Sequence, residues 1–181
     1  MGRDKAALAV GGETLAARAA RRLLDVCGSV VVADGGRGLL LPLPGFPSVP
    51  DGPGQGPAAG ILGAACAYPG HPLLVLACDL PAIPAALLAE LAAADGAADW
   101  AVPRWQRGLE PLCALYRPAA LAELAAAVGR GVAAPHRLAE AAGLKVRYLE
   151  GRSLRRFGAP EDLFLNLNTP LDVERWISTS G

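Results

Sequence analysis

One carboxylate, Asp79, directly follows a short apolar run in the segment PLLVLACDLP at residues 72–81. Residues 73–77 lie between prolines and are all apolar, which predicts a strand buried on both faces of a parallel sheet. Open α/β sheets bind ligands at the carboxyl ends of their strands. Mg²⁺ needs only one or two protein carboxylates, because phosphates and waters complete its shell. The segment therefore predicts a site for Mg²⁺ and a phosphate at Asp79, in preference to a role in capping the turn.

A glycine-rich segment, VPDGPGQGPAAG at residues 49–60, is a second candidate. Gly56 and its neighbouring glycines permit close approach of a ligand to the backbone. A helix that begins near Pro57 would present free N–H groups to an anion, with Asp51 just before it at a strand end. An ordinary flexible loop explains the segment equally well on its own. The segment is neither a Walker A loop nor the G-x-G-x-x-G dinucleotide fingerprint.

Two further motifs carry polar groups suited to a nucleotide or its acceptor. Lys5, in MGRDK, can place an ammonium near a phosphate, although a solvated surface lysine is the simpler interpretation. Asn166 and Asn168, in FLNLNTP, lie on one side of a predicted strand because side chains alternate with period two. Their amides suit a polar ligand or a weakly held metal, whereas Asn168 and Thr169 also suit the cap of a final helix.

The segment PRWQRGLEPL contains several charged residues. Arginine suits anionic ligands through bidentate contacts, but we favour scattered surface charge for this group. No Ser-His-Asp or Cys-His arrangement is evident. The group consists of Arg104, Arg107 and Glu110, with Arg155 and Arg156 later in the chain.

Composition excludes several classes of protein. The 181 residues carry 17 basic and 17 acidic side chains, so no basic field favours nucleic acid as the partner. The four cysteines form no C-x-x-C pair, which favours buried thiols in a reducing compartment over disulfides or zinc. No apolar run is long enough for a membrane span or a signal peptide. We expect a single cytoplasmic domain over residues 1–181, with no membrane partner.

Strand-like and helix-like segments alternate along the chain, which predicts a three-layer α/β/α domain of Rossmann-like type with a mostly parallel mixed sheet. The pattern is most diffuse over residues 129–165. Strands are expected at residues 29–33, 48–49, 73–77, 100–102, 112–116, 145–149 and 164–167, and helices at residues 14–26, 57–67, 84–94, 118–128, 136–142 and 169–177.

Taken in chain order, the motifs MGRDK, VPDGPGQGPAAGI, VLACDLP, LEPLCALY and NLNTP resemble the molybdenum cofactor guanylyltransferases, which are nucleotide-diphospho-sugar transferase-like enzymes. Each motif is weak alone, but the ordered set is specific and extends over essentially the whole chain. The resemblance implies that GTP and Mg²⁺ bind at the strand ends. It also implies that the phosphate of molybdopterin attacks the α-phosphorus, which gives molybdopterin guanine dinucleotide and pyrophosphate.

The resemblance also implies roles for single residues. By position, Lys5 would neutralise the triphosphate, and Asp51 and Gly56 would lie near the nucleotide. Asp79 would bind Mg²⁺. The paired asparagines of the family match Asn166 and Asn168, which would lie near the pterin or the metal. Other proteins of cofactor biosynthesis are further expected partners.

The sequence departs from the family pattern at its start. The family places an apolar strand and a loop of the type L-A-G-G-x-S-x-R directly before M-G-x-D-K, whereas this sequence begins at Met1 of that motif. We expect the first strand of the sheet and the phosphate loop to be missing from the chain as given, with a true start upstream of Met1. Ala33 is a second departure, because some members of the family carry a polar residue there.

Three other functions stay open from sequence alone. The segments GPAAG and ACDLP favour GTP, whereas the related cytidylyltransferase of the same cofactor would use CTP. A nucleotidyltransferase for another small phosphate is the second alternative. The third, of a different class, is a non-catalytic binding protein that lacks the phosphate loop.

We predict that this chain binds GTP more weakly than the same chain extended at its N-terminus by an L-A-G-G-x-S-x-R strand and loop. The extension would supply the phosphate-binding backbone and pair the open strand edges of the sheet. Calorimetric titration of both proteins with GTP measures the difference. Equally tight binding by the two proteins would contradict the expectation.

Overall fold

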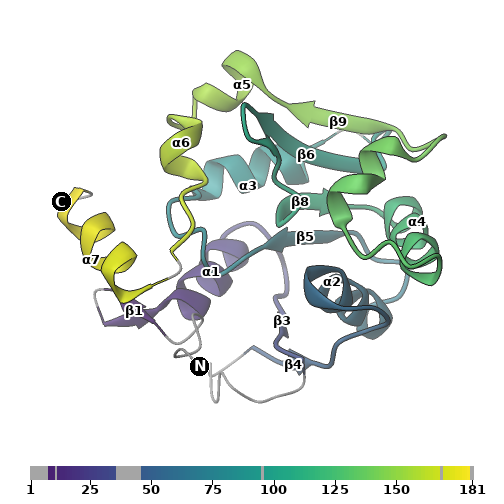
Figure 1. The fold of residues 1–181 in the computed structure, drawn as a ribbon, viewed down its shortest axis with the longest axis horizontal. Coiled ribbons are helices and arrows are strands. Elements are labelled where there is room, and N and C mark those ends of the chain that lie inside the picture. The colour runs from purple at the N-terminus through teal and green to yellow at the C-terminus, as the bar shows by residue number, and fades with distance from the viewer. Residues whose placement is uncertain (1–7, 11, 36–45, 95, 168, 180–181) are drawn as a thin grey trace.

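The fold is taken from a computed structural model that describes residues 8–10, 12–35, 46–94, 96–167 and 169–179. Its centre is a five-stranded mixed sheet with the order β5-β8-β6-β7, in which β9 also pairs with β6 (Figure 1). β8 is antiparallel to both β5 and β6, whereas β9 is parallel to β6, so β5, β6 and β9 point the same way. These strands are β5 (Leu73–Leu76), β6 (Trp100–Trp105), β7 (Gly108–Leu109), β8 (Cys113–Tyr116) and β9 (Val146–Leu149).

Two smaller sheets precede the main one in the chain. β1 (Ala9–Val10) and β2 (Glu13–Thr14) are antiparallel, and β3 (Val32–Ala33) and β4 (Ser48–Val49) are parallel. The Ser48 hydroxyl donates a 2.7 Å hydrogen bond to the buried Asp34 carboxylate, which fastens the end of β3 to β4. Within the described residues, no strand pairs with the edge of β5 that faces away from β8.

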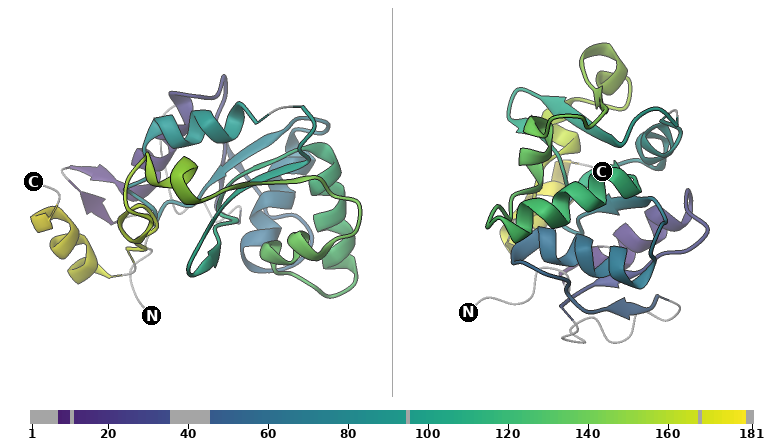
Figure 2. Two further views of the ribbon diagram at one scale, coloured as in Figure 1. Left: turned by 90° about the horizontal axis from the view of Figure 1, so that it is seen from above. Right: turned by 90° about the vertical axis from the view of Figure 1, so that its right-hand side faces the viewer.

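Helices cover both faces of the main sheet, as the alternation along β8 requires. Cys113 and Leu115 point into a core that α1 (Leu15–Leu24) and α3 (Ala85–Ala92) also line. Ala114 and Tyr116 point the other way, toward α2 (Gly56–Ala67) and α4 (Pro118–Gly129). Figure 2 shows α2 and α4 side by side on that face. The expected three-layer α/β/α architecture is therefore confirmed.

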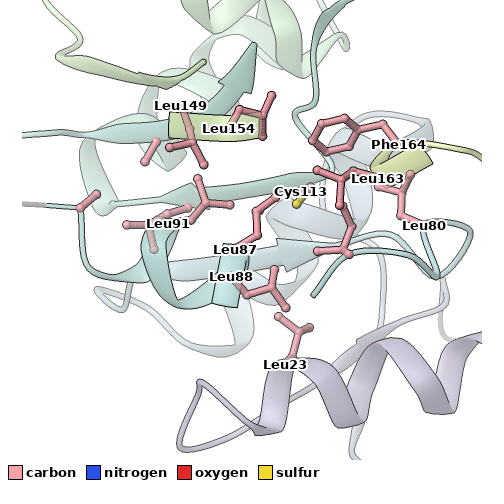
Figure 3. Packing of buried hydrophobic residues seen from close by; sticks show 14 of the residues in the cluster. Leu23, Leu80, Leu87, Leu88, Leu91, Cys113, Leu149, Leu154, Leu163 and Phe164 are labelled. Carbon is pink, nitrogen blue, oxygen red and sulfur yellow. The ribbon is translucent and has the colours of Figure 1, made fainter. Parts of the chain in front are cut away.

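The first of these two cores is built mainly from leucines of several elements. In Figure 3, Leu87 of α3 lies next to Cys113 of β8 and Leu88 points toward Leu23 of α1. Leu91 lies at the other end of α3, beneath Leu149. These three α3 leucines are at most 2% exposed. Burying a leucine completely stabilises a fold by about 1.5–3 kcal/mol, so α3 contributes strongly to holding the sheet and α1 together.

After β9 the chain continues through α5 and α6 and ends with α7, at the left edge of Figure 1. Thr169 and Asp172 form a capping box, in which the backbone N–H of each donates to the side chain of the other (2.8 and 3.2 Å). No helix within the described ranges is long and apolar enough to cross a bilayer. The helices after α4 are the 3₁₀ helix η2 (Pro135–Glu140), α5 (Gly151–Arg155), α6 (Pro160–Leu163) and α7 (Pro170–Thr179).

Three expectations about elements were wrong. β5 pairs with an antiparallel strand rather than parallel neighbours, and its residues are only partly buried because its other edge has no described partner. The first helix ends at Leu24 instead of residue 26. Residues 164–167 form a turn and an irregular segment rather than a strand, since Phe164 and Leu167 are both buried with no ladder beside them.

A close glycine contact sets the position of the segment that carries Asp51. A Cβ placed on Gly63 of α2 would lie 2.0 Å from the carbonyl oxygen of Pro50, and one on Gly52 would lie 2.6 Å from the Gly63 nitrogen. The Gly52 N–H donates to the Ala59 carbonyl at 2.8 Å. The backbone after β4 can therefore lie directly against α2 only because both positions lack side chains.

We predict that Gly63→Ala lowers the free energy of unfolding by about 1–3 kcal/mol, because its methyl group must displace the Pro50 backbone. Gly60→Ala is the matched control in the same helix, where a Cβ would meet nothing closer than 3.4 Å. That control should be neutral or stabilising by up to about 1 kcal/mol. Urea unfolding of both variants checks this, and equal stabilities would contradict it.

Candidate active site

The backbone around Asp79 is fixed from two sides. The Ala77 N–H donates to the Leu112 carbonyl at 2.8 Å, and the Asp79 carbonyl accepts from the Leu167 N–H at 3.0 Å. Asp79 is half-buried in the turn that follows β5. The predicted position of this carboxylate at the end of a strand is confirmed, and the turn also holds Leu167 beside it.

A second carboxylate, Glu110, faces the same place because β5 and β8 are antiparallel. Leu76 is paired with Cys113, so the residues that follow β5 lie beside those that precede β8. The Glu110 backbone is held by hydrogen bonds to Pro103 (N–H to carbonyl, 3.1 Å) and from Cys113 (N–H to the Glu110 carbonyl, 3.0 Å). Two acidic residues 31 positions apart in the chain are thereby brought to one end of the sheet.

These residues surround a cavity of about 300 Å³. Its polar lining comes from Asp79, Glu110 and Asn166, which belong to three separate segments of the chain. The rest of its wall is apolar. It is formed by Ala77, Leu80, Pro111 and Leu112.

The electrostatics of Glu110 differ from those of a surface carboxylate. Its side chain accepts a 2.6 Å hydrogen bond from the Trp105 indole Nε1–H. Burial raises the pKa of the Glu110 carboxyl, and the nearby Asp79 charge raises it further, against the opposing effects of the Trp105 hydrogen bond and the Arg107 charge. A half-buried carboxylate with a fixed donor on one side is prepared for a ligand that brings positive charge or N–H groups.

Glu110 was missed from sequence, where it was assigned to scattered surface charge with Arg104 and Arg107. Surface charge is correct for Arg104, which is exposed, pairs with Glu150 and stacks on Tyr148 at 3.9 Å. The usable signal for Glu110 was its place, three residues before the apolar run that forms β8. An acid at that position mirrors Asp79 at the end of β5.

Asp51 and Gly56 lie on other elements. Asp51 is exposed just after β4, and Gly56 is the first residue of α2. Gly56 has φ +60°, a conformation that favours glycine, and the N-cap Gln55 makes no side-chain bond to the helix amides. Neither residue lines the cavity beside Asp79. The structure thus brings Asn166 to Asp79 and places Asp51 with Gly56 at a separate strand and helix.

Two of the predicted site residues, Lys5 and Asn168, lie outside the described residues. Among the residues that are described, no group of three or more His, Cys, Asp or Glu side chains could hold a metal on its own. Two carboxylates and one amide do share the cavity. This oxygen-rich donor set fits Mg²⁺, which takes one or two protein carboxylates and obtains its other ligands from phosphates and water.

Known proteins resemble this chain over most of its length. The family described as MobA-like NTP transferase domain matches residues 1–145. A protein of Pelotomaculum thermopropionicum named "Probable molybdenum cofactor guanylyltransferase" is 35% identical over 96% of this chain and 83% of its own. A protein of the same name from Opitutus terrae is 35% identical over 97% of this chain and 87% of its own.

A solved structure shares the fold over nearly its whole length. Molybdopterin-guanine dinucleotide biosynthesis protein A from Archaeoglobus fulgidus superposes with a TM-score of 0.77 at 25% identity, over 99% of this chain and 93% of its own. The order of helices and strands described above is therefore that of nucleotide-diphospho-sugar transferase-like enzymes.

We predict that two substitutions move the pKa of Glu110 in opposite directions in protein without added divalent ions. Trp105→Phe should raise it further, because the donor that stabilises the carboxylate is lost. Asp79→Asn should lower it, because a nearby negative charge is removed. Carboxyl ¹³C NMR titration measures both shifts, and Glu110→Gln identifies the signal by removing it. Shifts of the same sign in the two variants would contradict this account.

Proposed function

Because the chain belongs to the MobA-like NTP transferase family, we propose that it is a molybdenum cofactor guanylyltransferase. It transfers GMP from GTP to the terminal phosphate of molybdopterin. An oxygen of that phosphate bonds to the α-phosphorus of GTP, the bond from the α-phosphorus to the bridging oxygen breaks, and pyrophosphate leaves with the electron pair. The proposal rests on a sequence identity of 35%, over nearly the whole chain, to proteins of this name.

The chain needs no nucleophile of its own for this reaction. Transfer at phosphorus depends on holding the two substrates in line and on stabilising the negative charge. Asp79 would hold Mg²⁺, which supplies positive charge to the triphosphate. Asp79 suits that role because backbone hydrogen bonds on both sides of its turn fix its position.

The nucleotide and the acceptor are proposed to occupy different halves of the sheet. Asp51 and the α2 N-terminus at Gly56 would lie near the nucleotide, since free helix amides attract anions. Lys5 would neutralise the triphosphate. Asn166, which shares the Asp79 cavity, would lie toward the pterin together with Asn168. The substrates GTP and molybdopterin fit an enzyme that acts in the cytoplasm beside the other proteins of this biosynthesis.

We predict that Asp79→Asn lowers Mg²⁺-dependent GMP transfer by at least about 100-fold, the order of effect expected when one stabilising electrostatic group is lost. The matched control is Asp25→Asn at the exposed C-cap of α1, which should retain full activity. Release of pyrophosphate from GTP in the presence of molybdopterin is measured for both variants, with CTP tested in parallel.

Activity of Asp79→Asn at the level of the control would refute the metal assignment. Preference for CTP over GTP would refute the choice of nucleotide while leaving the class of reaction intact. Tight GTP binding with no transfer by the unsubstituted protein would instead indicate a binding protein.

A further inference from the structure

The cavity beside Asp79 has an apolar wall next to both of its carboxylates. Pro111 and Leu112 follow Glu110 directly, and Ala77 and Leu80 stand on either side of Asp79 in the chain. Phosphates do not gain from such a wall, whereas a flat heteroaromatic ring does. The cavity therefore offers one charged group, Asp79, for a phosphate-bound cation and a second, Glu110, beside a surface suited to a ring.

Glu110 is held in place before any ligand arrives. The Trp105 indole donates to one carboxylate oxygen at 2.6 Å, and its ring packs against Phe164 at a centroid distance of 5.8 Å. Both backbone polar groups of Glu110 are hydrogen-bonded, to Pro103 and from Cys113. A carboxylate has about four lone-pair positions, so one indole donor leaves acceptor capacity for a ligand.

A fixed carboxylate beside an apolar wall suits a ring edge with two adjacent N–H donors. The 2-amino-4-oxopyrimidine edge has this pattern, because it carries a ring N–H next to an exocyclic amino group. Both the pterin of the acceptor and the guanine of GTP possess this edge. Glu110 precedes β8, whereas Asp51 and Gly56, which we assign to the nucleotide, lie at β4 and α2. The pterin is therefore the better match.

We propose that Glu110 is a specificity-determining residue that binds the N–H edge of the acceptor's pterin ring. This inference rests on the proposed function, since that function supplies the pterin. Asp79 and Glu110 then divide the cavity, with the metal and phosphates at the former and the pterin ring at the latter. Trp105 is a positioning residue that acts through Glu110.

The test compares the unsubstituted protein with Glu110→Gln, and with Glu140→Gln as an exposed control away from the cavity. Three quantities are measured: the affinity for pterin-6-carboxylate by its fluorescence, the affinity for GTP with Mg²⁺ by calorimetry, and KM for molybdopterin in GMP transfer. Glu110→Gln should weaken pterin binding and raise KM for molybdopterin by about tenfold or more, since a hydrogen bond to a charged group is lost. Its GTP affinity should stay within about twofold of the unsubstituted value.

Trp105→Phe is the second variant, in case Glu110→Gln unfolds. It keeps the ring packing on Phe164 but removes the donor, and should weaken pterin binding by about three- to tenfold. Circular dichroism confirms that each variant is folded. Pterin binding in Trp105→Phe equal to that of the control would overturn the proposal.

The other outcomes are equally decisive. Loss of GTP affinity with pterin affinity unchanged would assign Glu110 to guanine, and a fall in kcat alone would assign it to the metal or the reacting phosphates; both overturn the proposal. No pterin binding by the unsubstituted protein overturns it as well. Pterin binding that depends on Glu110, without any GMP transfer, would refute the proposed function and leave this contact standing.

Discussion

The antiparallel pairing of β5 with β8 is the constraint on which the site depends. Because Leu76 lies opposite Cys113, the exit from β5 and the entry to β8 meet at the same end of the sheet. Asp79 and Glu110 are neighbours for this reason alone. A parallel partner for β5 would have placed the residue before that strand at the opposite end, and the cavity would then hold one carboxylate.

The register of this pair is in turn fixed by burial. All four residues of β8 are at most 5% exposed, two facing each helical layer. A slip by one residue would exchange the two faces and place Tyr116 against the α3 layer. Partly exposed ion pairs such as Arg147 with Glu90 stabilise by about 0.2–1 kcal/mol, less than one fully buried leucine. The core, rather than surface charge, therefore holds the site residues in place.

Much of this arrangement was predictable from sequence because local patterns encode it. Local apolar runs, prolines and caps account for the strand before Asp79, the short strand at Ser48, the helix that begins near Pro57 and the capping box of Thr169 with Asp172.

The role of Glu110 was not predictable in this way. It depends on strand order and direction, which single-chain periodicity does not contain, and on an indole bond from Trp105 five residues away. The irregular segment at residues 164–167 was mistaken for a strand because its apolar and polar residues alternate with the period of a strand. In the structure, the Leu167 N–H donates instead to the carbonyl of Asp79 in the turn after β5.

Two carboxylates that share one cavity also restrict what can bind there. The Asp79 charge disfavours ionisation of Glu110, and both carboxylates repel a triphosphate. A nucleotide can approach Asp79 only when a cation accompanies it, so the same charge that would hold Mg²⁺ excludes the bare nucleotide. Burial has removed part of the water around Glu110, and the Trp105 indole supplies one donor in its place. A ligand with N–H donors would replace more of that lost water. The cavity is thereby divided by chemistry: a metal-bound phosphate relieves the charge of Asp79, and a donor-bearing ring relieves that of Glu110.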